Sequence, residues 1–386
     1  LIIALLKQAD IQAYPAMINT YPGAKFDDGL PMLNFDHMIT YVKTKTDTYW
    51  LDTSGQTGTF PGISLNLEAK KAFVVNEKAG EIVQLPATTS ADNIATVNID
   101  FSLDKTILNT QVSLDLVGHV ETNLRNYMQF SPNALAAAEQ IMSPLLFNKR
   151  ISEFENSDPI DITQPFTLSA SFNDIAEITS DIDSFRYSYD FSAILSVFTS
   201  LSNLDPVANR KFDFAILQPI TVVINSYYPQ PWPKAKVGYS QPAQNIANEF
   251  FELTHLVEEK TDGVYLTSRF VLPKQVVKVT QYADFYQQVD EFASHSQSLI
   301  IYQKPLQSSG GVSVASTDLI GKIQLSKSLL EKSQFVEALV AIQEVVASDE
   351  SNAEAQYLLG LALGFTGEDL QSEQAFERAE QLGYQF

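Results

Sequence analysis

Apolar and polar residues alternate along much of the chain between residues 87 and 305. The clearest example is residues 95–103, where Ala, Val, Ile, Phe and Leu occupy every second position and polar residues lie between them. A period of two is expected for a strand that buries one face. The recurrence of this pattern predicts a β sandwich or a large curved sheet. Similar runs occupy residues 112–116, 166–172, 220–224, 264–272, 276–279 and 299–302.

Two segments of this β-rich region have helical patterns instead. Residues 133–146 predict a helix with Ser131 as its N-cap and Pro132 at its first position. Residues 244–251 predict a second helix, and the acidic stretch from Glu252 to Asp262 is interpreted as a solvated helix end.

The first 86 residues predict a helix followed by a mainly antiparallel sheet, an α+β arrangement. Pro15, inside the first predicted strand, indicates an edge strand or a bulge. The prolines and glycines of residues 21–33 and the small residues of 53–62 indicate loops. The helix is predicted at residues 1–9, and the strands at 11–20, 38–43, 48–51, 72–75 and 81–85.

The pattern becomes helical and repetitive after a small, polar stretch, QSSGGVSVAST, which predicts a linker at residues 306–318. At an offset of 34 residues, small residues align with small ones and large apolar residues with large ones. This period is typical of tetratricopeptide repeats, and two are predicted, at 319–352 and 353–386. A generic pair of helical hairpins is the alternative. Because two repeats are few for a stable solenoid, we expect the tail to pack on the β domain or to continue past Phe386.

The chain is therefore predicted to be an α+β domain at 1–86, a mostly β, sandwich-like domain at 87–305, a linker at 306–318 and an α-helical repeat tail at 319–386. The net charge of −21 argues against nucleic-acid binding, because a polyanion would be repelled. No apolar run reaches the length of a membrane helix, and no signal peptide is visible. The apolar, uncapped start, LIIALLKQADI, indicates that an N-terminal portion is missing.

Candidate chemistry lies in the stretch FDHMITYVKTKTDTYWLD. His37 begins one predicted strand and Asp52 ends the next. If these strands form a hairpin, the two side chains are neighbours, as a general base and the acid that orients it must be. Polar residues at the ends of an ordinary hairpin are the alternative interpretation. The sequence contains no cysteine, so the chain cannot perform thiol chemistry by itself.

The order of a helix, AYPAMINT, a proline-rich loop, FDHMITYV and YWLDTS resembles the second half of bacterial transglutaminase-like domains, which have the papain-like fold. The resemblance covers about residues 1–86. It implies that His37 is the catalytic histidine, that Asp52 is the acid of the triad, and that residues 1–6 belong to the helix that follows the catalytic cysteine. The sequence departs from the family at Asp36, where Asn is usual, and at Thr53 and Ser54, which replace Pro-Thr.

On this resemblance, the leading hypothesis is the C-terminal part of a thiol acyltransferase or hydrolase acting on peptide or glutamine amides. It is an enzyme only if a cysteine lies upstream of Leu1. The alternative is a non-catalytic scaffold that binds a protein partner through residues 319–386. A protein or peptide substrate, no cofactor and a location in the bacterial envelope or periplasm are expected, with the cytoplasm as an alternative.

The remaining histidines do not predict a metal site. His119 is isolated, and His255 and His295 lack nearby carboxylates at the spacing of zinc ligands. The segment from Tyr227 to Pro233, YYPQPWP, is either a platform for stacking a sugar or peptide, or an ordered loop between strands.

Overall fold

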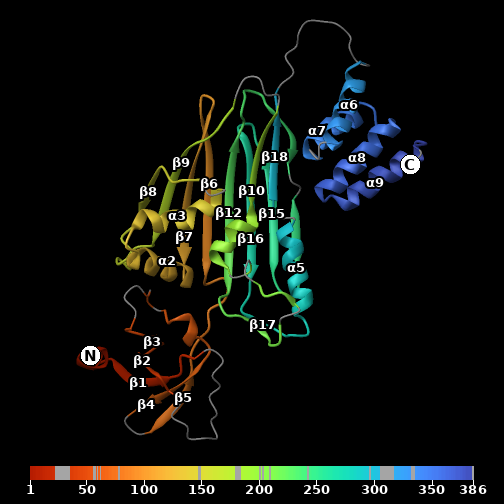
Figure 1. Ribbon diagram of the computed structural model, residues 1–386. Helices are drawn as coiled ribbons and strands as arrows, with labels where there is room; N and C mark the ends of the chain where they lie inside the picture. Colours follow the sequence, from red (N-terminus) through yellow and green to blue (C-terminus); the bar gives the residue numbers. More distant parts are fainter. Residues whose placement is uncertain are drawn as a thin grey trace. The chain divides into compact units, whose positions relative to one another are not determined.

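The structure, a computed structural model, is a mixed α/β protein with several mostly open sheets, and it divides into two compact units (Figure 1). The first unit contains residues 1–233 and 240–299, and the second contains 234–239 and 300–386. The structure describes residues 1–21, 35–54, 58, 60, 62–76, 79–146, 149–178, 184–199, 201, 204–207, 210–240, 243–294, 297–304, 317–331 and 335–384.

A five-stranded antiparallel sheet forms the N-terminal part of the first unit, in the order β3-β2-β1-β4-β5. Its core contains Trp50 and Tyr41, whose rings lie 4.8 Å apart, packed with small and aliphatic residues of the central strands. Most strands follow the sequence pattern closely. The elements are α1 (Ile2–Gln8), β1 (Gln12–Ile18), β2 (His37–Lys43), β3 (Thr48–Leu51), the short 3-10 helix η1 (Leu65–Leu67), β4 (Lys71–Val75) and β5 (Gly80–Gln84).

Pro15 lies in the central strand of this sheet, so its assignment to an edge strand or a bulge is wrong. It pairs in register with Thr40 of β2. On the other side, β4 pairs only with Ala16 and Met17. Pro15 therefore lies just beyond that short ladder, where its missing N–H costs no hydrogen bond to β4. The predicted loop at 21–33 lies, apart from Tyr21, outside the described residues.

An eight-stranded sheet dominates the rest of the first unit, in the order β14-β15-β16-β12-β6-β7-β9-β8. Among the described residues, its strands pair antiparallel except for β6 and β12, which are parallel. The strands are β6 (Ile94–Asp104), β7 (Ile107–Val117), β8 (Glu153–Asn156), β9 (Thr167–Glu177), β12 (Ile220–Pro229), β14 (Gln244–Ala247), β15 (Glu252–Glu259) and β16 (Gly263–Leu272).

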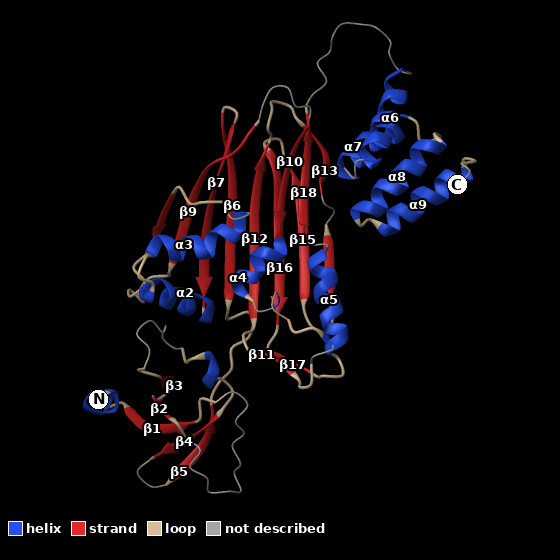
Figure 2. Ribbon diagram, in the orientation of Figure 1, coloured by secondary structure: helices blue, strands red, loops and turns tan. Residues whose placement is uncertain are grey.

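Helices cover one face of the large sheet (Figure 2). Phe292 of α5 packs on Phe270 of β16, and Tyr187 of β10 packs on Phe101 of β6. The second layer therefore contains helices and β10, which is a strand of a further, three-stranded sheet. Of the two predicted arrangements, a sandwich or a large curved sheet, the structure has one large sheet whose second layer is partly helical. The covering elements are α2 (His119–Phe130), α3 (Ala134–Met142), α4 (Phe191–Phe198), α5 (Tyr282–Ser294) and β10 (Ser184–Asp190); β11 (Phe214–Ile216) and β17 (Gln275–Val277) form a separate antiparallel pair, and the 3-10 helix η2 (Ser143–Leu146) follows α3.

The predicted helix at 244–251 and the helix end at Glu252–Asp262 are wrong, because these segments form the hairpin β14–β15. Asn248 makes its turn: its Oδ1 accepts hydrogen bonds from the N–H groups of Phe250 and Phe251, both at 2.8 Å. The predicted helix at 133–146 is present as α3 and η2, but its N-cap is Asn133 rather than Ser131. The Asn133 Oδ1 accepts a hydrogen bond of 3.1 Å from the Ala136 N–H.

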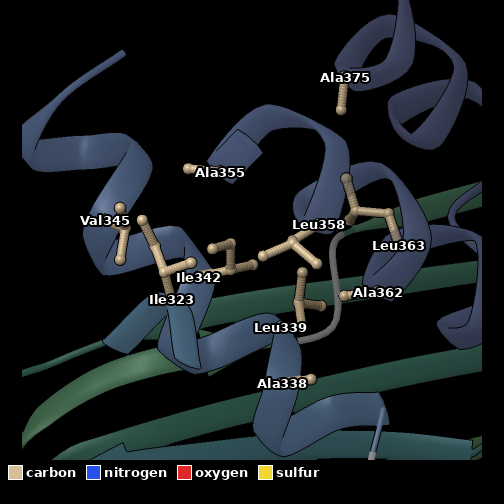
Figure 3. Close-up of a cluster of buried hydrophobic side chains, with 10 residues drawn as sticks. All are labelled: Ile323, Ala338, Leu339, Ile342, Val345, Ala355, Leu358, Ala362, Leu363 and Ala375. Carbon is tan, nitrogen blue, oxygen red and sulfur yellow. The ribbon is translucent and has the colours of Figure 1, made fainter. Parts of the chain in front are cut away.

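The second unit contains four described helices that share a core of buried aliphatic residues (Figure 3). Tyr239 of β13 packs against this core, and its hydroxyl donates a hydrogen bond of 3.2 Å to the Glu368 carboxylate. Its helices are α6 (Thr317–Glu331), α7 (Phe335–Ser348), α8 (Ala353–Thr366) and α9 (Asp369–Gln381). It also contains residues 236–239 of β13 (Lys236–Ser240) and residues 300–303 of β18 (Gln297–Gln303). Most of the predicted linker at 306–318 lies outside the described residues.

The two helical hairpins repeat one contact at the 34-residue offset. The Ser326 hydroxyl of α6 donates to the Ala338 carbonyl of α7 at 3.1 Å. The Ser372 hydroxyl of α9 donates to the Gly360 carbonyl of α8 at 2.7 Å. Residues 326 and 360 are equivalent, as are 338 and 372, so the serine has changed helix while the contact is retained. The sequence repeat therefore corresponds to a structural one, and its assignment to the tetratricopeptide family stays a prediction.

Candidate active site

His37 and Asp52 lie side by side at one end of the β2–β3 hairpin. His37 is the first residue of β2, and Asp52 directly follows β3. The antiparallel register, in which Thr40 is opposite Leu51, places the start of one strand beside the end of the other. The Nε2 atom of His37 lies 3.0 Å from Oδ2 of Asp52. The proximity expected from the hairpin is thus present, while the catalytic roles of both residues stay a prediction.

Asp52 is held as a carboxylate by donors on both of its oxygens. Its Oδ1 accepts hydrogen bonds from the Ser54 N–H at 3.0 Å and the Ser54 hydroxyl at 2.7 Å. Burial alone would raise the pKa of Asp52, but the hydrogen bonds from Ser54 and His37 outweigh it and hold the pKa below its ordinary value. The Asp52 side chain is only 8% exposed, against 24% for His37.

Among the described residues, the contact with Asp52 involves only one of the two ring nitrogens of His37. When Asp52 is ionised, it accepts a hydrogen bond, so the Nε2 atom facing it carries the proton. The Nδ1 atom makes no hydrogen bond to any residue in the described part of the chain. A neutral imidazole in this tautomer has a lone pair on Nδ1, which can take a proton from a nucleophile.

Asp36, next to the histidine, connects the start of β2 to the end of β1 through hydrogen bonds with Thr20. Its carboxylate accepts hydrogen bonds from the Thr20 N–H at 2.7 Å and the Thr20 hydroxyl at 2.6 Å. These bonds lower the pKa of Asp36 below its ordinary value. Lys70 secures the same region by donating to the carbonyls of Asn19 and Tyr21 at 2.9 and 2.8 Å. The start of β2, and with it His37, is therefore fixed against the end of β1.

Sequence reasoning missed these supporting residues. A serine two positions after an aspartate is a common local hydrogen-bonding pattern, so Ser54 could have been noticed. Thr20 bonds to Asp36, and Lys70 bonds to the segment after β1, across long sequence separations. No local sequence pattern predicts such contacts.

His119, which stands alone in the sequence pattern, is a hydrogen-bonded core histidine within a buried polar cluster. Its Nε2 lies 2.6 Å from Oε1 of Glu68, whose side chain is 1% exposed. The Thr88 hydroxyl donates to the same oxygen at 2.7 Å, and the Lys274 ammonium lies 3.4 Å from Oε2. Burial alone would raise the pKa of Glu68, but the bonds from His119 and Thr88 lower it to about 2.

The other histidines form no metal centre within the described residues. His255 is buried and its Nδ1 lies 2.8 Å from the Ser268 hydroxyl, while burial lowers the pKa of the imidazole. His295 lies outside the described residues. No group of three or more His, Cys, Asp or Glu side chains in the described ranges is arranged to hold a metal ion.

The aromatic segment beginning at Tyr227 is divided between the two faces of the large sheet. Tyr228 is 1% exposed and stacks on Phe101 in the core, with ring centroids 5.1 Å apart. Tyr227 points to the opposite face, where it contacts Tyr265. Because residues 227–229 belong to β12, the expected loop between strands begins only after Pro229.

Comparisons with known proteins are sparse. No family model and no curated protein matches the chain. A solved structure described as "a putative protease from Parabacteroides distasonis" is similar with a TM-score of 0.39 and 11% identity. The match covers 78% of this chain and 42% of that protein, so the chain spans less than half of its length. At this TM-score the similarity carries no inference about fold or activity. No helix in the described ranges has the length and apolar character needed to cross a membrane.

Proposed function

We propose that residues 1–86 are the C-terminal part of a transglutaminase-like, papain-type domain and carry the base and the orienting acid of a thiol acyl-transfer site. The observation that supports this most strongly is the 3.0 Å contact between His37 Nε2 and Asp52 Oδ2. It leaves the second imidazole nitrogen for the nucleophile and places an ionised, largely buried carboxylate behind the ring.

The proposed reaction begins with a cysteine thiol that this sequence does not contain. His37 Nδ1 accepts the thiol proton, and the thiolate attacks the carbonyl carbon of a peptide or glutamine side-chain amide. The imidazolium then donates its proton to the departing nitrogen, which leaves as an amine or ammonia and produces a thioester. A second amine or a water molecule attacks the thioester while His37 again takes a proton, and the thiol is regenerated.

Asp52 has two roles in this scheme. Its hydrogen bond fixes the tautomer and orientation of the imidazole, and its negative charge stabilises the imidazolium that forms when the thiol loses its proton. Replacing Asp52 by Asn keeps the size of the side chain but removes the charge, so the substitution tests both roles.

The test uses the protein expressed from its complete coding sequence. Wild-type protein, incubated with a glutamine-containing protein and a fluorescent primary amine, is expected to incorporate the amine or to release ammonia. His37→Ala should reduce the rate by about 10³-fold or more, and Asp52→Asn by about 10²-fold or more. Asp104→Asn, at an exposed position at the end of β6, serves as the matched control and should retain full activity.

Two results would overturn the proposal. One is the absence of a cysteine from the coding sequence upstream of Leu1. The other is full activity of the His37→Ala protein, with folding of all variants checked by circular dichroism. In either case His37 and Asp52 would be polar residues that stabilise a hairpin end.

We also propose that residues 319–352 and 353–386 are repeats of the tetratricopeptide type that bind a protein partner. The support is the equivalent serine–carbonyl contact in both hairpins. Deletion of 319–386 from the complete protein should abolish co-purification of the partner but preserve acyl transfer by the thiol site.

A further inference from the structure

Two tyrosines form a fixed aromatic pair on the face of the large sheet that the helices do not cover. Tyr227 of β12 lies directly opposite Tyr265 of β16, and their ring centroids are 4.8 Å apart with an interplanar angle of 33°. The Tyr265 hydroxyl donates to Oδ2 of Asp262 at 2.7 Å, and the Tyr227 hydroxyl donates to the Asp262 carbonyl at 3.2 Å. Both rings are half-buried, and Tyr265 is flanked by the Tyr227 ring and by the Lys260 ammonium, so Tyr227 is the ring of the pair that can contact a ligand.

A row of short polar side chains crosses the strands beside this pair. Thr267 donates to Asn225 Oδ1 at 3.3 Å, and Asn225 Nδ2 donates to Asn98 Oδ1 at 3.0 Å. Asn98 Nδ2 continues the row by donating to Asp115 at 3.2 Å. The amides are therefore oriented by each other, and an amide held in place loses little freedom when it binds a ligand.

The tyrosine pair and the polar row lie next to each other on the same face. Asn225 and Tyr227 are two residues apart on β12, a separation of about 7 Å along the strand. In the register with β6, Asn98 is opposite Asn225 and exposed Asp100 is opposite Tyr227. Neighbouring strands are about 4.8 Å apart, close to the length of one sugar unit in an extended β-linked glycan. If a glycan lies across the strands, each successive sugar unit is therefore above the next strand.

The charges of this face disfavour an anionic partner. Carboxylates outnumber cations beside the tyrosine pair and the polar row. The Lys260 ammonium lies 4.1 Å from the centre of the Tyr265 ring and 3.1 Å from the Glu258 carboxylate, and Arg269 is exposed. The carboxylates are those of Asp100, Asp115, Glu258 and Asp262. The whole chain carries a net charge of −21, which repels polyanions and a second copy of itself. The face has few apolar side chains of the kind that anchor protein partners.

We propose that this face binds an uncharged, extended β-linked glycan, with a sugar ring packed against Tyr227 and its hydroxyls bonded to Asn98, Asn225 and Asp100. Aromatic rings provide the apolar contact for the C–H faces of sugars, and amides and carboxylates bond their hydroxyls. This site lies on the large sheet and is independent of the proposed thiol chemistry.

The experiment is a titration of the full chain with β-1,4-linked hexamers of glucose and of N-acetylglucosamine. Binding is measured by calorimetry and by NMR of the backbone amides. At least one hexamer should bind with a dissociation constant below about 1 mM. In the wild-type protein the amide signals of Asn98, Asn225 and Thr267 should shift. Tyr227→Ala should weaken binding about tenfold and Asn225→Ala about fivefold.

Matched variants separate binding from folding. Tyr227→Phe keeps the ring and should bind within about twofold of wild type. Tyr127→Ala removes an exposed tyrosine from helix α2 and should have no effect. The proposal is overturned if neither hexamer binds at millimolar concentration, if Tyr227→Ala binds like wild type, or if the shifted amides lie elsewhere. Preferential binding of heparin, or a dimer that Asn225→Ala dissociates, would assign the face to another partner and equally overturn it.

Discussion

At the scale of single residues, the candidate site depends on which hydrogen bonds each carboxylate oxygen of Asp52 makes. Oδ2 faces the imidazole, and Oδ1 is occupied by both donors of Ser54. A carboxylate bound at one oxygen only could rotate and lose its alignment with the ring. Ser54 therefore orients the group that orients His37.

Replacing Ser54 by Ala tests this arrangement. The substitution removes the hydroxyl donor but keeps the backbone N–H, so the pKa of Asp52 should rise toward its ordinary value. Because a lowered pKa stabilises the folded state above the unfolded pKa, the variant should lose about 1 kcal/mol near neutral pH. Carboxyl ¹³C NMR during an acid titration gives the pKa directly. Ser54→Thr keeps a hydroxyl and should titrate like wild type, and an unchanged pKa in Ser54→Ala would contradict the prediction.

The sequence contains enough information to predict that His37 and Asp52 are neighbours, but not which residues support them. The hairpin pattern places these two residues at adjacent strand ends, because the register follows from the short turn at Thr44–Asp47. The contact between Thr20 and Asp36 depends instead on where β1 ends against β2, which the sequence pattern locates only to within a few residues.

At the scale of elements, the buried Glu68 carboxylate joins segments that are far apart in the sequence. Glu68 follows η1 of the small sheet, His119 begins α2, and Lys274 follows β16. Asn93 completes the junction: its Oδ1 accepts from the His119 N–H at 2.8 Å, and its Nδ2 donates to the Thr88 hydroxyl at 3.0 Å. The small sheet and the large sheet thus share one polar anchor.

Glu68→Gln should destabilise the first unit by about 2–3 kcal/mol at pH 7, because it removes a buried negative charge from its cationic and hydroxyl partners. The sign of the pH dependence follows from the lowered pKa of about 2. The wild-type contribution is complete above the ordinary value of 4.5 and is lost as the pH falls toward 2. Urea unfolding of both proteins between pH 7 and 3 measures this contribution to the free energy of unfolding. The difference between the two proteins should shrink on acidification, and a constant difference would refute the assignment.

Two glycines of the helical hairpins should respond oppositely to the same substitution. A Cβ at Gly360 of α8 would lie 2.7 Å from the Phe376 ring, so Gly360→Ala should destabilise by about 1–2 kcal/mol. A Cβ at Gly321 of α6 meets nothing within 4 Å, so Gly321→Ala should stabilise by up to about 1 kcal/mol through helix propensity. Thermal unfolding followed at 222 nm distinguishes them, and shifts of the same sign would show that the helices do not pack as described.

The strands were more predictable than the helices of the β-rich region. Alternation identifies β6 and β16 because each buries one face against the helical layer. Helix α5 escaped prediction because its sequence, YADFYQQVDEFAS, is rich in aromatic residues that also favour strands. The pattern of residues 244–251 predicts a helix because nothing local shows that Asn248 starts a turn.

At the scale of the whole molecule, the excess of acidic residues opposes folding. Each unit must bring together like charges that the unfolded chain keeps apart, and the net charge is −21. The division into units could not be predicted either. The strands β13 and β18 belong with the helices partly through the contact of Tyr239 with Glu368, which joins residues separated by 129 positions.

Added salt should therefore stabilise the protein. Raising NaCl from about 10 to 150 mM shortens the screening length from about 30 to 8 Å, which weakens repulsion between exposed carboxylates. We expect the midpoint of thermal unfolding to rise by a few degrees, measured by calorimetry at pH 7. Sucrose of equal osmolality is the control for solvent effects. A lower midpoint in salt would show that favourable ion pairs dominate the electrostatics.

The parallel pairing of β6 with β12 has a consequence for the order of events during synthesis. Asn98 and Asn225 face each other across this pair but are separated by 127 positions. The hairpin of β6 and β7 can form as soon as it leaves the ribosome. The edge of β6 that faces away from β7 stays unpaired until β12 has been synthesised. During that interval β6 exposes an unpaired edge to any neighbouring chain. The nascent protein is thus exposed to edge-to-edge aggregation between translation of these two strands, and slower elongation there would lengthen the exposure.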